Sequence, residues 1–173
     1  YGVQNNVTCT GSGKVTITAS VSESGSNAVA VGGDLTQKGS GEVTVTVDSS
    51  ANLRTYSSYG VNGTLTQKGS GKVTVTANQN AGAAYGLYGA RTVVLNSPGQ
   101  VNVTADGHGY AQYVDGAYDL TTAGSVNGEF TAKNGTDLTN GANNITLGHT
   151  AGSVKLNASG SADTVEAVRF APE

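Results

Sequence analysis

Apolar and polar residues alternate strictly in several short stretches of this chain, most clearly in Val43-Thr-Val-Thr46 and Val73-Thr-Val-Thr76. A period of two predicts β-strands with one buried face. Val and Thr are both branched at Cβ, which suits a pleated sheet better than a helix. No stretch of ten residues carries an apolar stripe at helical spacing, so we expect essentially no helix.

The alternating stretches belong to a longer repeat. Leu35–Thr46 returns as Leu65–Thr76 with one substitution, and looser copies occupy Val7–Thr18, Val93–Thr104 and Gly152–Ala158. The first apolar residue of the second strand recurs every 25 to 30 residues, at Val15, Val43, Val73, Val101, Val126 and Val154. An earlier strand is marked in the same way by Val7, Leu35, Leu65, Val93, Leu120 and Ile145. The chain therefore contains six units of similar design.

Evenly spaced short strands are typical of an antiparallel sandwich as well as of a solenoid. The strands of a sandwich lie in different environments and need not resemble one another, whereas equivalent residues of a solenoid stack and share one environment. The recurrence of Val at matching positions favours stacking. We expect an all-β fold, a single-stranded right-handed parallel β-helix of about six coils of 25–30 residues, with residues 1–173 forming one solenoid domain.

The residues between and beside the strands fit this arrangement. Gly39–Gly41 and Gly69–Gly71 are Gly-Ser-Gly segments, which tolerate tight turns. The residues directly before the recurring valines Val15, Val43, Val73 and Val101 are Lys14, Glu42, Lys72 and Gln100. Stacking would therefore place charges of opposite sign on adjacent coils, about 4.8 Å apart.

Composition excludes several classes of function. The net charge is −3 and the nine basic residues are scattered, whereas nucleic acid and anionic membranes both require clustered Lys and Arg. No run of about 18 apolar residues exists, so we expect no membrane insertion by this segment. Cys9 is the only cysteine, which rules out an internal disulfide and a zinc site made of thiolates.

The Gly-, Thr- and Val-rich coils, with the phrases Ala84–Ala90 and Gly107–Tyr113, resemble the passenger regions of bacterial autotransporters and related surface adhesins. The resemblance covers the whole chain and implies a secreted, cell-surface β-helix that serves as a stalk for adhesion or display. It brings no catalytic motif. We therefore expect a non-enzymatic extracellular module without a cofactor, which is a segment of a longer chain or a subunit that associates head to tail into a filament.

Two sets of side chains are candidates for a contact surface. If the Val positions point inward, a Thr-x-Thr ladder points outward and resembles the ice-binding face of insect-type β-helical antifreeze proteins. The ladder contains Thr16, Thr18, Thr44, Thr46, Thr74, Thr76 and Thr104, and it is interrupted at Gly128, Lys155 and Asn157. The alternative is that Thr is simply a favoured strand residue.

The second set is a Tyr-x-x-Tyr pair in three successive units at nearly equal phase. Its members are Tyr56, Tyr59, Tyr85, Tyr88, Tyr110 and Tyr113. On the surface these rings would form an amphipathic strip able to hold a sugar ring or a protein. Inside the coil they would only fill a wide corner. We expect a glycan or a protein surface as the partner if the strip is exposed.

A polysaccharide-degrading enzyme of the pectate lyase or polygalacturonase kind would gather several carboxylates, or calcium with basic residues, in a cleft. Asp48 and Asp106 instead occupy turn positions shared with Ser20 and Asn78, which indicates turn chemistry. His108 and His149 belong to no metal-binding motif. We therefore expect no catalytic and no metal-ligating residues, although polysaccharide binding or degradation stays an alternative to adhesion and ice binding.

Overall fold

The computed structural model of the chain describes residues 1–23, 26–50 and 55–169. Within these residues the regular secondary structure consists of strands alone. Every ladder between the strands is parallel, as expected when each coil pairs with the coils before and after it. The predicted all-β solenoid of about six coils is confirmed.

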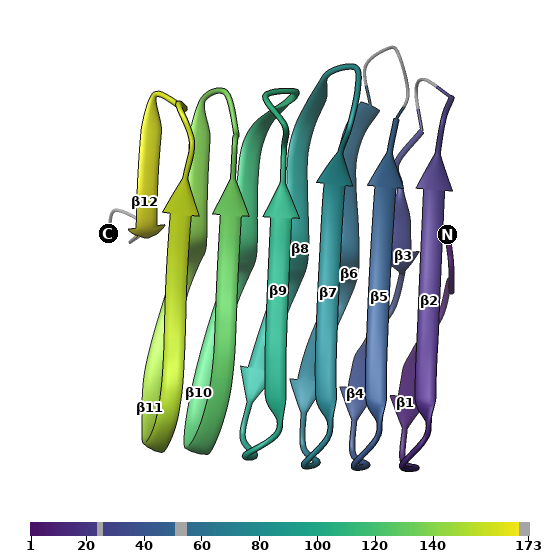
Figure 1. Cartoon of the computed structure of the whole chain (residues 1–173), viewed down its shortest axis with the longest axis vertical. Helices are drawn as coiled ribbons and strands as arrows, with labels where there is room; N and C mark the ends of the chain where they lie inside the picture. Colours follow the sequence, from purple (N-terminus) through teal and green to yellow (C-terminus); the bar gives the residue numbers. More distant parts are fainter. Residues whose placement is uncertain (24–25, 51–54, 170–173) are drawn as a thin grey trace.

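The coils form two layers (Figure 1). The front layer contains β2 (Lys14–Val21), β5 (Glu42–Ser49), β7 (Lys72–Gln79) and β9 (Gln100–Asp106). The back layer contains β1 (Val7–Cys9), β3 (Val29–Val31), β4 (Leu35–Gln37), β6 (Thr55–Gln67), β8 (Ala84–Leu95) and β12 (Thr164–Val168). The long strands β10 (Ala111–Lys133) and β11 (Leu138–Ser159) pass from the back layer into the front one.

The direction of the strands gives the hand of the coil. In Figure 1 the front strands run upward, the back strands run downward, and successive coils are added toward the C-terminal end on the left. Travel around the axis and advance along it therefore describe a right-handed coil. This hand agrees with the strong preference of parallel crossover connections.

Equivalent apolar residues stack in the core as the repeat predicts. Val15, Val43, Val73 and Val101 are direct partners on adjacent strands of the front layer. In the back layer, the predicted column from Val7 to Ile145 is also in register. Each coil alone would expose its apolar row, so burial requires neighbours on both sides.

The assignment of Val126 to the valine column is wrong. Val101 pairs with Gly128, and Gly128 pairs with Val154. A Cβ atom on Gly128 would lie 2.9 Å from Cε2 of the fully buried Phe130 ring. The ring therefore occupies the space that a valine side chain fills in the other coils, and Gly128 is what makes room for it.

Buried glutamines close the corner that leads from the back layer to the front. Gln37 and Gln67 are direct partners and both are fully buried. The Gln37 Nε2 atom donates to the Gly41 carbonyl at 2.8 Å, and the Gln67 Nε2 atom donates to the Gly71 carbonyl at the same distance. These bonds give the buried amide groups of the glutamines a partner, while the same two carbonyls also accept a backbone N–H from the next coil. In the next coil Leu95 takes the same position, so the corner becomes apolar.

Candidate functional site

A bend in the back layer shapes one of the surface hollows of the molecule. Cβ atoms on Gly60 and Gly89 would lie 2.4 Å and 2.2 Å from side-chain atoms of Val75 and Val103 in the front layer. Only glycine allows the two layers to approach so closely. The residues just before these glycines, Tyr59 and Tyr88, consequently point away from the core.

The alternation of inward and outward residues breaks at this bend. Ala90 follows the inward Gly89, yet it is fully buried as well. The next outward residue is therefore Arg91. Outward side chains on the two sides of the bend converge on a hollow of about 260 Å³ that is lined by Tyr59, Tyr88, Arg91 and Tyr118.

Three tyrosine rings shape the hollow. Tyr59 and Tyr88 are direct partners on β6 and β8, and their ring centroids lie 4.9 Å apart at an interplanar angle of 12°. The Tyr118 ring meets Tyr88 edge-on, at 6.3 Å and 73°. Burial, reinforced by the neighbouring Asp115 carboxylate, raises the pKa of the Tyr88 hydroxyl. Tyr88 therefore stays neutral and can donate a hydrogen bond at physiological pH.

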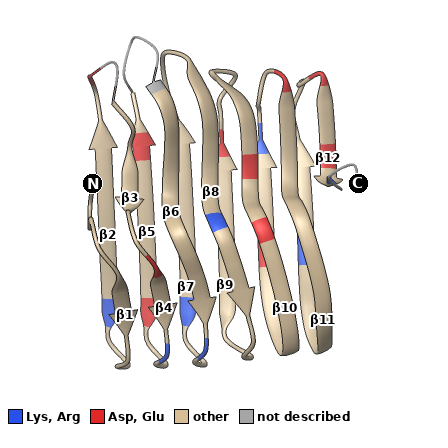
Figure 2. Cartoon of the chain, turned by 180° about the vertical axis from the view of Figure 1, so that it is seen from behind, with Lys and Arg blue, Asp and Glu red and all other residues tan. Residues whose placement is uncertain are grey.

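Arg91 brings a positive charge to this aromatic surface. Its side chain is exposed, and within the described residues it forms no ion pair and no side-chain hydrogen bond. Arg91 is the basic residue of β8, and the paired strand β10 contains Asp115 and Asp119; Figure 2 shows blue on β8 beside red on β10. The guanidinium group of Arg91 is therefore free to bind a ligand.

A buried polar pair continues the tyrosine column toward the C-terminal coils. Asp115 is the direct partner of Tyr88, and Asn140 is the direct partner of Asp115. The Asn140 Nδ2 atom donates to Asp115 Oδ1 at 2.9 Å. Burial raises the pKa of Asp115 to about 6, although the bond from Asn140 and the charge of Arg169 act in the opposite direction. Desolvation of the carboxylate is thus the dominant effect.

The remaining predicted tyrosines surround the hollow without forming a regular strip. Tyr56, Tyr85 and Tyr110 are exposed. The third pair, which was expected at nearly equal phase, lies two residues out of phase, because Tyr113 pairs with Gly86 and not with Tyr88. Its ring instead leans toward Tyr85, with centroids 5.0 Å apart. Tyrosines thus gather on the back layer, but the pairs of only two coils, Tyr56/Tyr59 and Tyr85/Tyr88, are aligned with each other.

The predicted threonine ladder lies on the front layer. Thr16, Thr44 and Thr74 form one column of direct partners, which Asn102 continues. Thr18, Thr46, Thr76 and Thr104 form the second column. The corrected register adds Thr131 to the second column, before Asn157 ends it. The expected interruption at Gly128 does not occur, because Gly128 belongs to the inward valine column.

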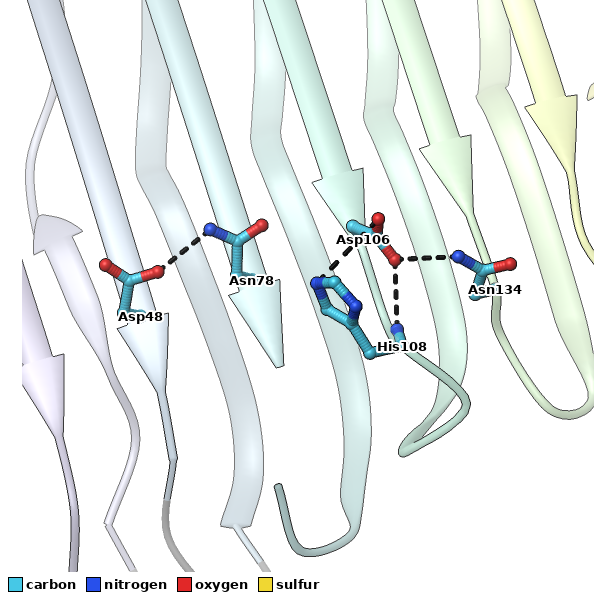
Figure 3. A network of polar contacts seen from close by, with 5 residues as sticks. All are labelled: Asp48, Asn78, Asp106, His108 and Asn134. Carbon is cyan, nitrogen blue, oxygen red and sulfur yellow. Dashed lines mark hydrogen bonds and ion pairs between the residues drawn. The ribbon is translucent and has the colours of Figure 1, made fainter. Parts of the chain in front are cut away.

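Asp48 and Asp106 take part in a polar column at the C-terminal ends of the front-layer strands (Figure 3). The Asn78 Nδ2 atom donates to Asp48 at 2.8 Å, and the Asn134 Nδ2 atom donates to Asp106 at 2.9 Å. The His108 backbone N–H also donates to Asp106, at 3.0 Å. These contacts link neighbouring coils and order a turn, as expected of Asn and Asp at such positions.

Other classes of site find no support in the part of the chain that the structure describes. Residues 1–23, 26–50 and 55–169 contain no group of three or more His, Cys, Asp or Glu side chains that could hold a metal ion. The same residues include no helix with the length and apolar character needed to cross a membrane.

Sequence reasoning missed Arg91, Tyr118 and Asp115. Arg91 could have been recognised as a candidate from the sequence, since it is the only Lys or Arg between Lys72 and Lys133. Tyr118 and Asp115 could not, because their place in the hollow depends on the bend, and the bend depends on contacts between the two layers.

Comparisons with known proteins give no family for this chain. A scan against protein-family models, a search of the curated proteins and a search of the solved structures each return no match. Its function is therefore inferred from the geometry of its surfaces.

Proposed function

We propose that this chain is a non-enzymatic structural and adhesive β-solenoid that acts outside the cell or on its surface. Its contact surface is the hollow lined by Tyr59, Tyr88, Arg91 and Tyr118, and its partner is a glycan. The observation that carries this proposal is the stacked pair of tyrosine rings at an open hollow on the back layer. The resemblance of the coils to adhesin passenger regions supports the extracellular setting.

Aromatic rings suit sugars for a physical reason. The C–H faces of a pyranose are apolar and pack on a flat ring, while the tyrosine hydroxyl groups remain available for hydrogen bonds to sugar hydroxyls. A single such contact is weak, so adhesion through it would depend on many copies acting together.

Glycan-array binding of the purified chain tests this proposal. We expect Tyr88→Ala to abolish binding, because it removes the ring that contacts both Tyr59 and Tyr118. Tyr88→Phe should retain most of it, since the ring remains. Tyr110→Ala is the matched control, because Tyr110 is exposed but does not line the hollow. Equal loss in the control, or no glycan bound by the parent chain, would refute the proposal.

Ice binding is a second candidate, and the unbroken column of five threonines from Thr18 to Thr131 favours it. Straight, paired strands hold these residues about 4.8 Å apart. Such a regular array of methyl and hydroxyl groups could order water at an ice surface.

Crystal shape and thermal hysteresis separate this candidate from adhesion. An ice-binding front layer predicts faceted crystals that Thr76→Tyr abolishes, whereas Thr66→Tyr, which alters the back layer, leaves them unchanged. Rounded, freely growing crystals with the parent chain would exclude this second function.

A further inference from the structure

We propose that the hollow selects a sugar that carries a carboxylate, with the pyranose ring on the tyrosines and the carboxylate on Arg91. This inference rests on the proposed glycan-binding function and specifies the class of ligand. It is based on one juxtaposition, an unpaired guanidinium group beside stacked aromatic rings.

The acids nearest along the strands leave Arg91 without a partner. Asp115 is only 3% exposed and accepts a hydrogen bond from Asn140. Asp119 accepts a hydrogen bond from the Asn144 Nδ2 atom at 3.0 Å. Neither forms an ion pair with Arg91 within the described residues. A planar guanidinium group with its donors free is well suited to a bidentate contact with a carboxylate.

The size of the hollow limits what it can hold. Its volume of about 260 Å³ lies below the range of roughly 300–1,000 Å³ that is common for pockets of drug-sized ligands. We therefore expect it to hold one ring of a longer chain. Arg91 and Tyr88 line the same small hollow from the two sides of the bend, so a single carboxylated ring can touch both.

A cationic ligand is the main competitor. Three aromatic rings near a buried carboxyl group could attract a quaternary ammonium ion. Arg91 opposes this, because its positive charge lines the same hollow. The net charge of −3 makes general attraction of anions unfavourable, so any binding of an acidic sugar must come from local contacts.

Calorimetric titration at about 150 mM salt, where long-range attraction is screened, tests this inference. The probes are oligogalacturonate, its methyl ester, sialyllactose and tetramethylammonium. We expect oligogalacturonate or sialyllactose to bind, and the methyl ester, which keeps the ring but loses the charge, to bind at least about tenfold more weakly. Comparison of oligogalacturonate with sialyllactose shows whether the hollow prefers a uronic acid or a sialic acid. Arg91→Gln should cause a similar loss, whereas Lys72→Gln, which removes one positive charge from the front layer, should not.

Each other outcome contradicts a stated part of the proposal. If the ester binds as well as the acid and Arg91→Gln has no effect, charge selection is wrong while glycan binding stands. If Lys72→Gln weakens binding as much as Arg91→Gln does, the attraction is not local. Preferential binding of tetramethylammonium would also overturn the inference. If no saccharide binds to the parent chain, the proposed function itself fails.

Discussion

At Asp115, burial outweighs the polar contacts around the carboxyl group and raises its pKa to about 6. The folded state then holds a proton that the unfolded state releases near pH 4. Below that pH both states are protonated and the group costs nothing. As the pH rises through 4 to above 6, folding loses up to about 3 kcal/mol at this site.

We therefore expect Asp115→Asn to stabilise the protein at pH 7 and to leave its stability unchanged near pH 4. The amide oxygen of the new Asn can still accept the hydrogen bond from Asn140. Thermal or urea unfolding of both proteins at several pH values measures the difference, and other titrating groups cancel in the comparison. A difference that does not grow with pH would show that Asp115 is solvated in the folded state.

Individual side chains also mark where sequence reasoning stops. The inward position of Val75 and the outward position of Thr76 follow from alternation and are confirmed. The inward position of Gly128 could not be predicted, because a missing side chain gives no apolar signal. Its role becomes visible only when the Phe130 ring is seen in the space beside it.

Strand β7 offers a direct comparison of the two faces of an element. Val75 is fully buried and pairs with Val45 and Val103, whereas the neighbouring Thr76 points outward. We expect Val75→Asp to lower the free energy of unfolding by several kcal/mol, at least about 3, because a carboxylate would be desolvated without a partner. Thr76→Asp introduces the same charge one residue away and should cost less than about 1 kcal/mol. Urea denaturation measures both, and equal effects would contradict the inward assignment.

Elements with the complete repeat were predictable, and those without it were not. The same twelve-residue pattern covers β4 and most of β5, and again the end of β6 and most of β7, so these strands and the turns between them could be assigned from the sequence. β10 lacks the Gly-Ser-Gly turn and instead runs through the corner, with a register shift between Gly124 and Ser125. Val126 was misplaced because the residue that pairs with Val101 is Gly128, which carries no apolar side chain. The third tyrosine pair is out of phase because Tyr110 precedes Ala111, the partner of Ala84, whereas Tyr85 follows Ala84.

For the molecule as a whole, recurrence at matching positions predicted parallel stacking, but it did not predict the hollow. Stacked residues share one environment, so the same residue types recur at matching positions of every coil. The hollow arises in the back layer where Gly60 and Gly89 touch the front layer, and contacts between layers leave no periodic signal. Fold was therefore more predictable than site.

Distances between spin labels along one outward column test the stacking most directly. Thr18 and Asn157 are exposed ends of the same column, five coil spacings apart, which corresponds to about 24 Å between their Cα atoms. Cysteine labels at these positions, with Cys9 replaced by Ser, can be measured by pulsed electron spin resonance. Moving the first label from Thr18 to Thr46 should shorten the distance by about 5 Å. An unchanged or longer distance would contradict in-register parallel coils.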